Sequence, residues 1–140
     1  MSTDYTALKT EIMKTGVPGL IADAIARSHR MVIQDAAYAA TVTPDFKYAR
    51  SGRLVVRIAA MTNDMTIANP IHSVNNNVIP VGAELKIVLL QDATGGRSIT
   101  WGSNYLKATD GSGTANQRGA TVYVYDGSKF IQISPPLTWY

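Results

Sequence analysis

The sequence predicts a mainly β protein, an antiparallel β-sandwich or jelly-roll-like domain with a short helical N-terminal segment. Near residue 31 the apolar residues change from helical spacing to a period of two. After that point, short β-rich runs alternate with clusters of turn-forming residues. A length of 140 residues suits one compact β domain. We therefore divide the chain into a helical segment, residues 1–30, and a β domain, residues 31–140.

The N-terminal segment is expected to form two short helices. Gly16 is placed to end the first helix, and Pro18 is placed to open the second. Apolar residues at helical spacing form a stripe that either attaches the protein to a partner or covers the domain's own sheet. The stripe consists of Tyr5, Leu8, Ile12, Leu20, Ile21 and Ile25.

Eight short runs in the β domain are expected to be strands. The clearest local signal is Asp126-Gly127, which supplies the backbone angles of a tight hairpin turn. The two runs that flank this turn should therefore pair antiparallel. The predicted strands are residues 31–33, 37–42, 54–59, 65–68, 84–91, 98–101, 121–125 and 129–134.

The run at residues 84–91 is apolar on both faces. Such a strand is either central and buried within its own chain, or has its second face covered by the helices or by another subunit. Aromatic residues on the outward face of residues 121–125 and at the C-terminus add further contact candidates, since aromatic side chains are enriched in interfaces. The candidate partner-binding residues of the β domain are Val88, Leu90, Tyr123, Tyr125, Trp139 and Tyr140.

Composition excludes several classes of function. The chain has no cysteine, which removes disulfides, thiolate zinc sites and cysteine nucleophiles. Its net charge of +3 is spread along the chain without a basic stripe, so nucleic acid is not an expected partner. No apolar run approaches the roughly 20 residues of a membrane span, and charged residues interrupt any secretory signal.

The sequence also shows no constellation of catalytic or metal-binding residues. The two histidines, His29 and His72, lack partners at metal-ligand or triad spacing. Residues 110–119 have the glycines of a phosphate loop without its Gly-Lys-Ser/Thr ending, which indicates a surface loop. The acidic residues lie singly in turns, where they usually bond their own backbone. We expect no catalytic residue, no metal and no cofactor, and hence no enzyme.

Three stretches, residues 66–70, 82–102 and 120–130, resemble a β module of tailed-bacteriophage virion proteins, found in tail fibres and tailspikes. The most specific part is a strand, then Gln-Asp-x-Thr-Gly-x-Arg, a second strand and Trp-Gly. In this motif we expect a tight reversal from Asp92 to Gly96, which includes Gly95, and an ion pair between Arg97 and a turn acid such as Asp92. Trp101 should enter the core or an intersubunit seam with its indole nitrogen bonded to backbone.

The resemblance implies a structural protein on the exterior of the virion, made in the host cytoplasm and assembled as a homotrimer. Because the chain is short, it favours a capsid decoration (cement) protein that binds the major capsid protein. The alternative is a small tail-fibre or tail-tip receptor-binding protein, attached to other tail proteins and contacting a bacterial surface glycan or protein.

Overall fold

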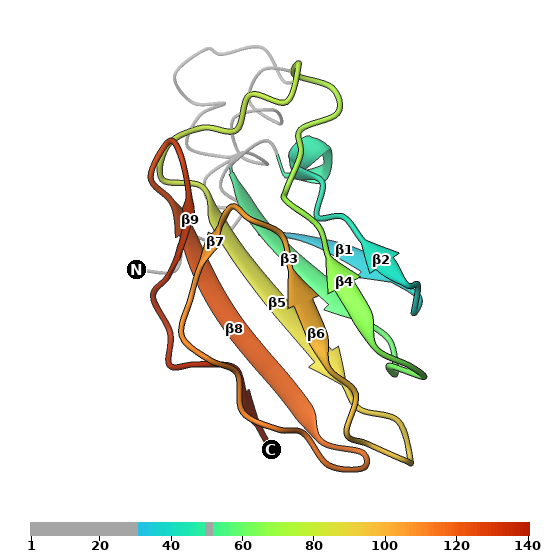
Figure 1. Cartoon of the computed structure of the whole chain (residues 1–140). Coiled ribbons are helices and arrows are strands. Elements are labelled where there is room, and N and C mark those ends of the chain that lie inside the picture. The colour runs from blue at the N-terminus through green and yellow to red at the C-terminus, as the bar shows by residue number, and fades with distance from the viewer. Residues whose placement is uncertain (1–30, 50–51) are drawn as a thin grey trace, which may run out of the picture.

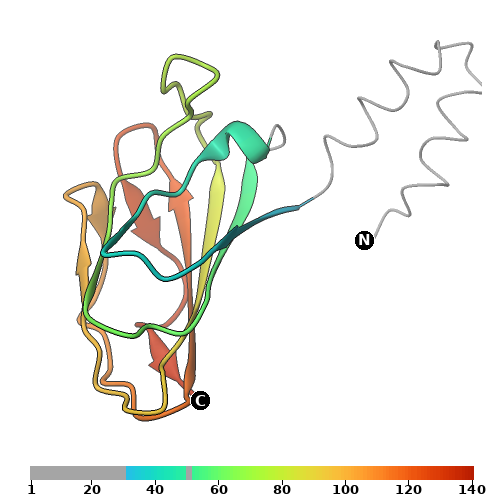
Figure 2. The same cartoon turned by 90° about the vertical axis from the view of Figure 1, so that its right-hand side faces the viewer.

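The computed structural model describes residues 31–49 and 52–140, and these residues form two facing β-sheets (Figures 1 and 2). The expected N-terminal helices and the stripe from Tyr5 to Ile25 lie outside the described residues. No helix within the described residues is long and apolar enough to cross a membrane.

The first two-thirds of the domain is a stack of three coils. In each coil, one strand lies in the first sheet and the next lies in the second sheet. In the first sheet β1 (Val32–Ala36), β3 (Arg53–Ile58) and β5 (Glu84–Leu90) pair in parallel. In the second sheet β2 (Thr41–Val42), β4 (Met65–Ile67) and β6 (Ile99–Trp101) also pair in parallel. Each coil therefore stacks directly on the one before it.

The C-terminal third completes the first sheet with antiparallel strands. β8 (Arg118–Tyr125) pairs antiparallel with β5, and a tight turn at Asp126-Gly127 returns the chain as β9 (Phe130–Gln132). Gly127 has a φ of 102°, and the Asp126 N–H donates to the Lys129 carbonyl. Two short strands finish the sheet: β7 (Tyr105–Leu106) beside β9, and β10 (Thr138–Trp139) beside β8. The predicted hairpin is confirmed.

The prediction of a mainly β domain is confirmed, but antiparallel pairing throughout is wrong. The coils pair in parallel because long connections carry the chain from one sheet to the other between paired strands. Period-two alternation is the same in a half-buried parallel or antiparallel strand, so the sequence pattern did not distinguish them. A jelly roll, whose strands are antiparallel, does not describe these coils.

Strand boundaries also differ from the predicted runs. Residues 37–40 are not strand, because this stretch forms the connection between β1 and β2. Phe46–Tyr48 forms a single 3-10 turn, η1, that no pattern indicated. The strands β7 and β10 were missed because two-residue strands show no periodicity.

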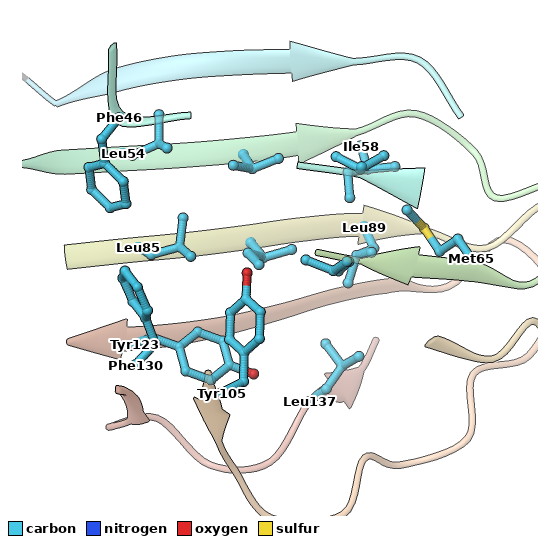
Figure 3. Close-up of a cluster of buried hydrophobic side chains, with 14 of the residues drawn as sticks. Phe46, Leu54, Ile58, Met65, Leu85, Leu89, Tyr105, Tyr123, Phe130 and Leu137 are labelled. Carbon is cyan, nitrogen blue, oxygen red and sulfur yellow. The ribbon is translucent and has the colours of Figure 1, made fainter. Parts of the chain in front are cut away.

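The core lies between the two sheets and draws on all three coils (Figure 3). Leu85, Ile87 and Leu89 of β5 are completely buried at its centre. At one end of the core, the ring of Tyr105 contacts two other rings. Its centroid lies 5.1 Å from that of Tyr123 and 6.0 Å from that of Phe130. Tyr123 is 0% exposed, so its expected outward placement is wrong; burial raises the pKa of its phenol. Tyr125 also turns inward and stacks on Phe130 at 4.7 Å.

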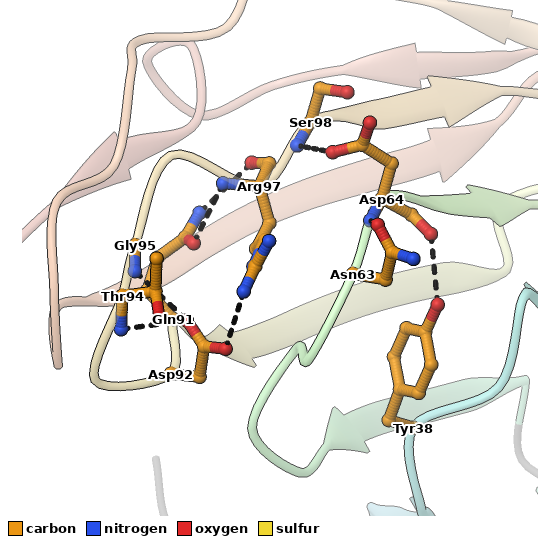
Figure 4. A network of polar contacts seen from close by, with 9 residues as sticks. All are labelled: Tyr38, Asn63, Asp64, Gln91, Asp92, Thr94, Gly95, Arg97 and Ser98. Atoms are coloured by element: carbon orange, nitrogen blue, oxygen red, sulfur yellow. Dashed lines mark hydrogen bonds and ion pairs between the residues drawn. The ribbon is translucent and has the colours of Figure 1, made fainter.

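Polar contacts hold the corners where the chain passes from the first sheet to the second (Figure 4). The Tyr38 hydroxyl of the first coil donates to the Asp64 carbonyl of the second at 3.0 Å. The Asp64 carboxylate accepts from the backbone N–H of Ser98 in the third coil at 2.8 Å. These three residues occupy equivalent corners of successive coils. Their hydrogen bonds therefore form a polar column that runs from coil to coil, in the direction in which the coils stack.

The predicted reversal after β5 is confirmed. One Asp92 carboxylate oxygen accepts from the backbone N–H groups of Thr94 and Gly95, and the other pairs with Arg97 at 2.9 Å. The Arg97 hydrogen bond lowers the pKa of Asp92. The side chain of buried Gln91 makes two hydrogen bonds with the backbone of Arg97. The Arg97 N–H donates to Gln91 Oε1 at 3.1 Å, and Gln91 Nε2 donates to the Arg97 carbonyl at 3.0 Å.

On the way back to the first sheet, Asp45 joins the first and second coils. Its buried carboxylate accepts from the backbone N–H of Lys47 at 2.9 Å and from the Ser73 hydroxyl at 2.7 Å. Burial by itself would raise the pKa of Asp45, but the hydrogen bonds from Lys47 and Ser73 outweigh it and the pKa is lowered. A carboxylate is therefore preferred to its protonated form at this corner.

Gly95 and Gly96 provide a matched test of the reversal, because each has a φ of 71°. A Cβ at Gly95 would overlap the backbone of Thr114 and Ala115, whereas a Cβ at Gly96 meets open space. Gly96→Ala should lower the free energy of unfolding by about 1–2 kcal/mol through backbone strain alone. Gly95→Ala should lower it by about 3 kcal/mol or more, because backbone must also move. Equal losses in chemical denaturation would contradict this packing.

Acid should destabilise the domain through Asp45. Since its pKa is lower folded than unfolded, its contribution is complete above the ordinary carboxyl value near 4 and is lost as pH falls further. Asp45→Asn should therefore flatten the fall in melting temperature below about pH 4. Asp35→Asn is the control: that exposed carboxylate pairs with Arg57, and 1 M salt should remove its effect but not that of Asp45. An unchanged pH profile in Asp45→Asn would refute this role.

Candidate functional site

A cleft of about 560 Å³ opens beside the second sheet, in the size range of ligand sites. Residues 96–99 and Trp101 form one side, residues 107–113 form another, and Leu137 and Trp139 complete it. These segments precede β6, follow β7 and include β10, so three chain stretches that are distant in sequence meet there. They lie toward the end of the molecule that carries the C-terminus (Figure 1).

Trp101 is fixed between the cleft and the aromatic part of the core. Its ring lies 5.0 Å from Tyr105 and 5.6 Å from Tyr123, and its indole N–H donates to the Asp110 carboxylate at 2.7 Å. The expectation of a bond to backbone is wrong here, since the acceptor is a side chain. Lys107 lies over the ring at 5.4 Å and pairs with Asp110 at 3.0 Å. Trp101 therefore anchors a charged pair at the cleft wall.

The indole ring of Trp139 packs closely against two glycines. A Cβ at Gly113 would come within 2.7 Å of its indole ring, and a Cβ at Gly119 within 2.9 Å. The indole N–H donates to the Gly111 carbonyl at 2.9 Å. Because hydrogen atoms at these glycines leave room for a flat ring, the side chain stays fixed while remaining partly exposed in the cleft.

Backbone hydrogen bonds connect the loops around the cleft. The Gly96 N–H donates to the Gly113 carbonyl at 2.9 Å, and the Gly111 N–H donates to the Leu137 carbonyl at 3.0 Å. Residues 110–117 form a surface loop, as predicted, whereas Arg118 and Gly119 belong to β8, and the glycines at 113 and 119 allow close packing against Trp139. The site is therefore largely formed before any ligand arrives.

The chemistry of the cleft suits binding. Of the described residues that line it, Asp110 is the one carboxylate, whereas sugar hydrolysis by the usual route needs two. Within residues 31–49 and 52–140, no group of three or more His, Asp or Glu residues could hold a metal ion. His29 lies outside this range, and the buried Nδ1 of His72 makes no hydrogen bond in it.

A second feature is the outer face of the first sheet, the face turned away from the core. Strand register places Ile131 beside Val124 on one side and Leu106 on the other, and Ile131 is 39% exposed. Val88 and Leu90 of β5 are half-buried on the same face. β5 is thus a central strand, as one of the two sequence interpretations held, yet its second face is still partly open.

The structure separates the predicted contact residues into different surroundings. Trp101 and Trp139 meet at the cleft, and Tyr140 is 82% exposed beside it. Val88 and Leu90 belong to the outer face, whereas Tyr123 belongs to the core. The cleft itself was missed, because its three segments carry no shared motif; the glycines at 111, 113 and 119 before a C-terminal tryptophan were its one sequence signal.

Residues 42–129 match a family model described as "Putative phage tail fibre C-terminal domain". The match covers more than half of the chain and runs from β2 through the turn after β8. The chain belongs to this family. No curated protein matches the chain.

Membership identifies a phage tail-fibre-type protein associated with the virion. The resemblance seen in the sequence is thereby confirmed, because its three stretches lie almost wholly within the matched residues. In this tail-fibre domain the Asp92 to Arg97 reversal and Trp101 are structural residues that shape one wall of the cleft.

The anchoring role of Trp101 gives a stability prediction. Trp101→Ala should lower the free energy of unfolding by about 3 kcal/mol, since a half-buried ring loses aromatic contacts and leaves Asp110 without a donor. Trp101→Phe should lower it by about 1–2 kcal/mol, because mainly the hydrogen bond is lost. Tyr140→Ala, at an exposed neighbour, should change it by less than about 0.5 kcal/mol. A loss below about 1 kcal/mol for Trp101→Ala in urea denaturation would contradict this role.

Proposed function

We propose that this protein is a tail-fibre protein on the virion exterior that contacts the bacterial surface during adsorption. The observation that carries the proposal is the family match over residues 42–129. The match favours the tail over the head and gives no support to the capsid decoration role that the chain length first suggested. The proposed role is binding without catalysis, and synthesis takes place in the host cytoplasm.

The cleft supports contact with a receptor. It combines fixed aromatic surface with a few polar groups, as ligand sites commonly do. The Asn75 to Asn77 turn, in the loop between β4 and β5, lies at the opposite end of the molecule (Figures 1 and 2). The structure thus gives the receptor-binding role one pre-formed candidate site, remote from that turn.

The experiment is adsorption competition with the full chain. Excess purified protein should slow adsorption of the phage to its host, and labelled antibody should mark the tail of the particle. An unrelated β protein of similar size serves as the control. Labelling of the head at high copy number, together with unimpeded adsorption, would restore the capsid decoration role and refute the proposal.

The proposal includes assembly as a homotrimer. Its support is the outer face of the first sheet, where apolar side chains of three strands stand in register and two of them, Leu106 and Ile131, are exposed. A second copy of the chain would bury Ile131 and Leu106, and the fibre module that the sequence resembles is commonly trimeric. Val88 and Leu90 lie on the same face, so a shared seam would also cover β5.

Light scattering should report about three times 15.1 kDa at micromolar concentration. Ile131→Glu should reduce the mass to that of one chain, because charges would face one another in the seam. Val78→Glu is the matched control, since Val78 is 60% exposed in the loop between β4 and β5, outside the sheet. A monomeric wild-type protein, or dissociation by both variants alike, would refute the outer-face seam.

A further inference from the structure

We infer that the cleft binds one sugar ring of a bacterial surface polysaccharide, with Trp139 as the stacking platform. This inference rests on the proposed contact with the bacterial surface and adds the ligand's chemical class and its location. A pyranose has one face of C–H bonds and a rim of hydroxyls. A site for it therefore needs a flat, fixed aromatic face surrounded by hydrogen-bonding groups.

Trp139 meets the requirement for a fixed platform. Its ring occupies the space that a Cβ at Gly113 or Gly119 would need, and the hydrogen bond from its indole N–H to the Gly111 carbonyl fixes its orientation. The electron-rich face of an indole attracts the partly positive C–H hydrogens of a sugar. Because the ring is already held, little side-chain entropy is lost on binding.

Trp101 is less suited to stacking. Lys107 lies over its ring, and two tyrosines pack against it from the core. Its role in the site is to hold Asp110, whose carboxylate is also paired with Lys107. The Asp110–Lys107 pair is mostly buried, with side-chain exposures of 19% and 13%, so it presents a fixed dipole at the cleft wall.

Hydroxyl groups surround the platform. Ser98, Thr109 and Ser112 line the cleft and are exposed. The Ser98 side chain also contacts the Asp64 carboxylate, so the hydroxyls of Thr109 and Ser112 are the ones best placed to donate to or accept from a ligand hydroxyl. The charged side chains of the lining are already paired, Lys107 with Asp110 and Arg97 with Asp92. Together with the neutral hydroxyls, these pairs favour an uncharged sugar over a phosphate or a strongly acidic one.

A protein receptor is a less suitable ligand for this site. Protein interfaces that bind stably bury about 800 Å² on each partner around an apolar centre. The cleft is small and rimmed by hydroxyls, and the exposed apolar residues gather elsewhere, on the outer sheet face and on the loop between β4 and β5. The cleft therefore favours recognition of a single ring or a short oligosaccharide.

The chain contains two tryptophans, and both line the cleft, so tryptophan signals report directly on this site. Full-length protein labelled with ¹⁵N-tryptophan should show two indole N–H resonances. Two probes distinguish the source of the glycan: the delipidated polysaccharide of host lipopolysaccharide, and purified host capsular polysaccharide. One of them should shift the Trp139 resonance more than that of Trp101, in a saturable manner. Unchanged resonances with both probes would overturn the inference.

Variants then test the platform. Trp139→Ala should weaken binding to the active polysaccharide by about tenfold, measured by sedimentation or surface immobilisation. Trp139→Phe should recover part of the loss, and Tyr140→Ala, an exposed aromatic that does not line the cleft, should bind as the wild type. If Trp139→Ala fails to fold, Ser112→Ala and Thr109→Ala, both on exposed loop residues, should each weaken binding severalfold. Wild-type affinity in these folded variants would overturn the inference.

Cells separate this inference from the proposed function. Periodate oxidation of host-surface glycans should abolish attachment of the protein, whereas protease treatment should leave it intact. If protease abolishes attachment and periodate does not, the surface receptor is a protein and the inference fails while the proposed function stands. If the protein attaches to no untreated host cells, the proposed function itself fails.

Discussion

The parallel stacking of three coils is the constraint on which the rest of this structure depends. Each coil must satisfy two ladders at once, β1-β3-β5 in one sheet and β2-β4-β6 in the other. A change in the length of one corner would shift a strand against its neighbour and turn its buried residues outward. The polar column from Tyr38 through Asp64 to Ser98 fixes the corners on one side, and Asp45 with Ser73 does so on the other. The long connection between β4 and β5 supplies Ser73 to the second of these contacts and then continues outside both ladders.

The antiparallel strands end the stack and create the cleft. Because β8 pairs with β5 in the opposite direction, the chain stops adding coils and the edge of the third coil is covered. The chain must cross from β6 in the second sheet to β8 in the first, and it does so through β7 and residues 107–117. This crossing brings the glycine-containing loop against β10, where Trp139 lies over Gly119 of β8. The cleft is thus a consequence of how the stack is closed.

The division of surfaces agrees with a tail-fibre domain. The segments that line the cleft lie toward one end of the molecule (Figure 1), whereas the apolar outer face follows the strands of the first sheet. Assembly along the sheet and contact at the end can therefore coexist in one small domain. In the homotrimer proposed above, several copies of a modest site would act together, and multivalent attachment would raise the effective affinity without any new contact.

Local features were determined by the sequence itself. The Asp126-Gly127 hairpin and the Asp92–Arg97 reversal were predictable, because turn chemistry acts within a few residues. Parallel pairing was not predictable from the sequence, since buried and exposed side chains alternate along β1 and β3 as they would in an antiparallel strand. The inward turn of Tyr123 also escaped, because Tyr and Val are equally suited to either face. Only the tertiary structure decided that Trp101, Asp110 and Trp139 share one cleft, for that depends on the order in which strands join the first sheet.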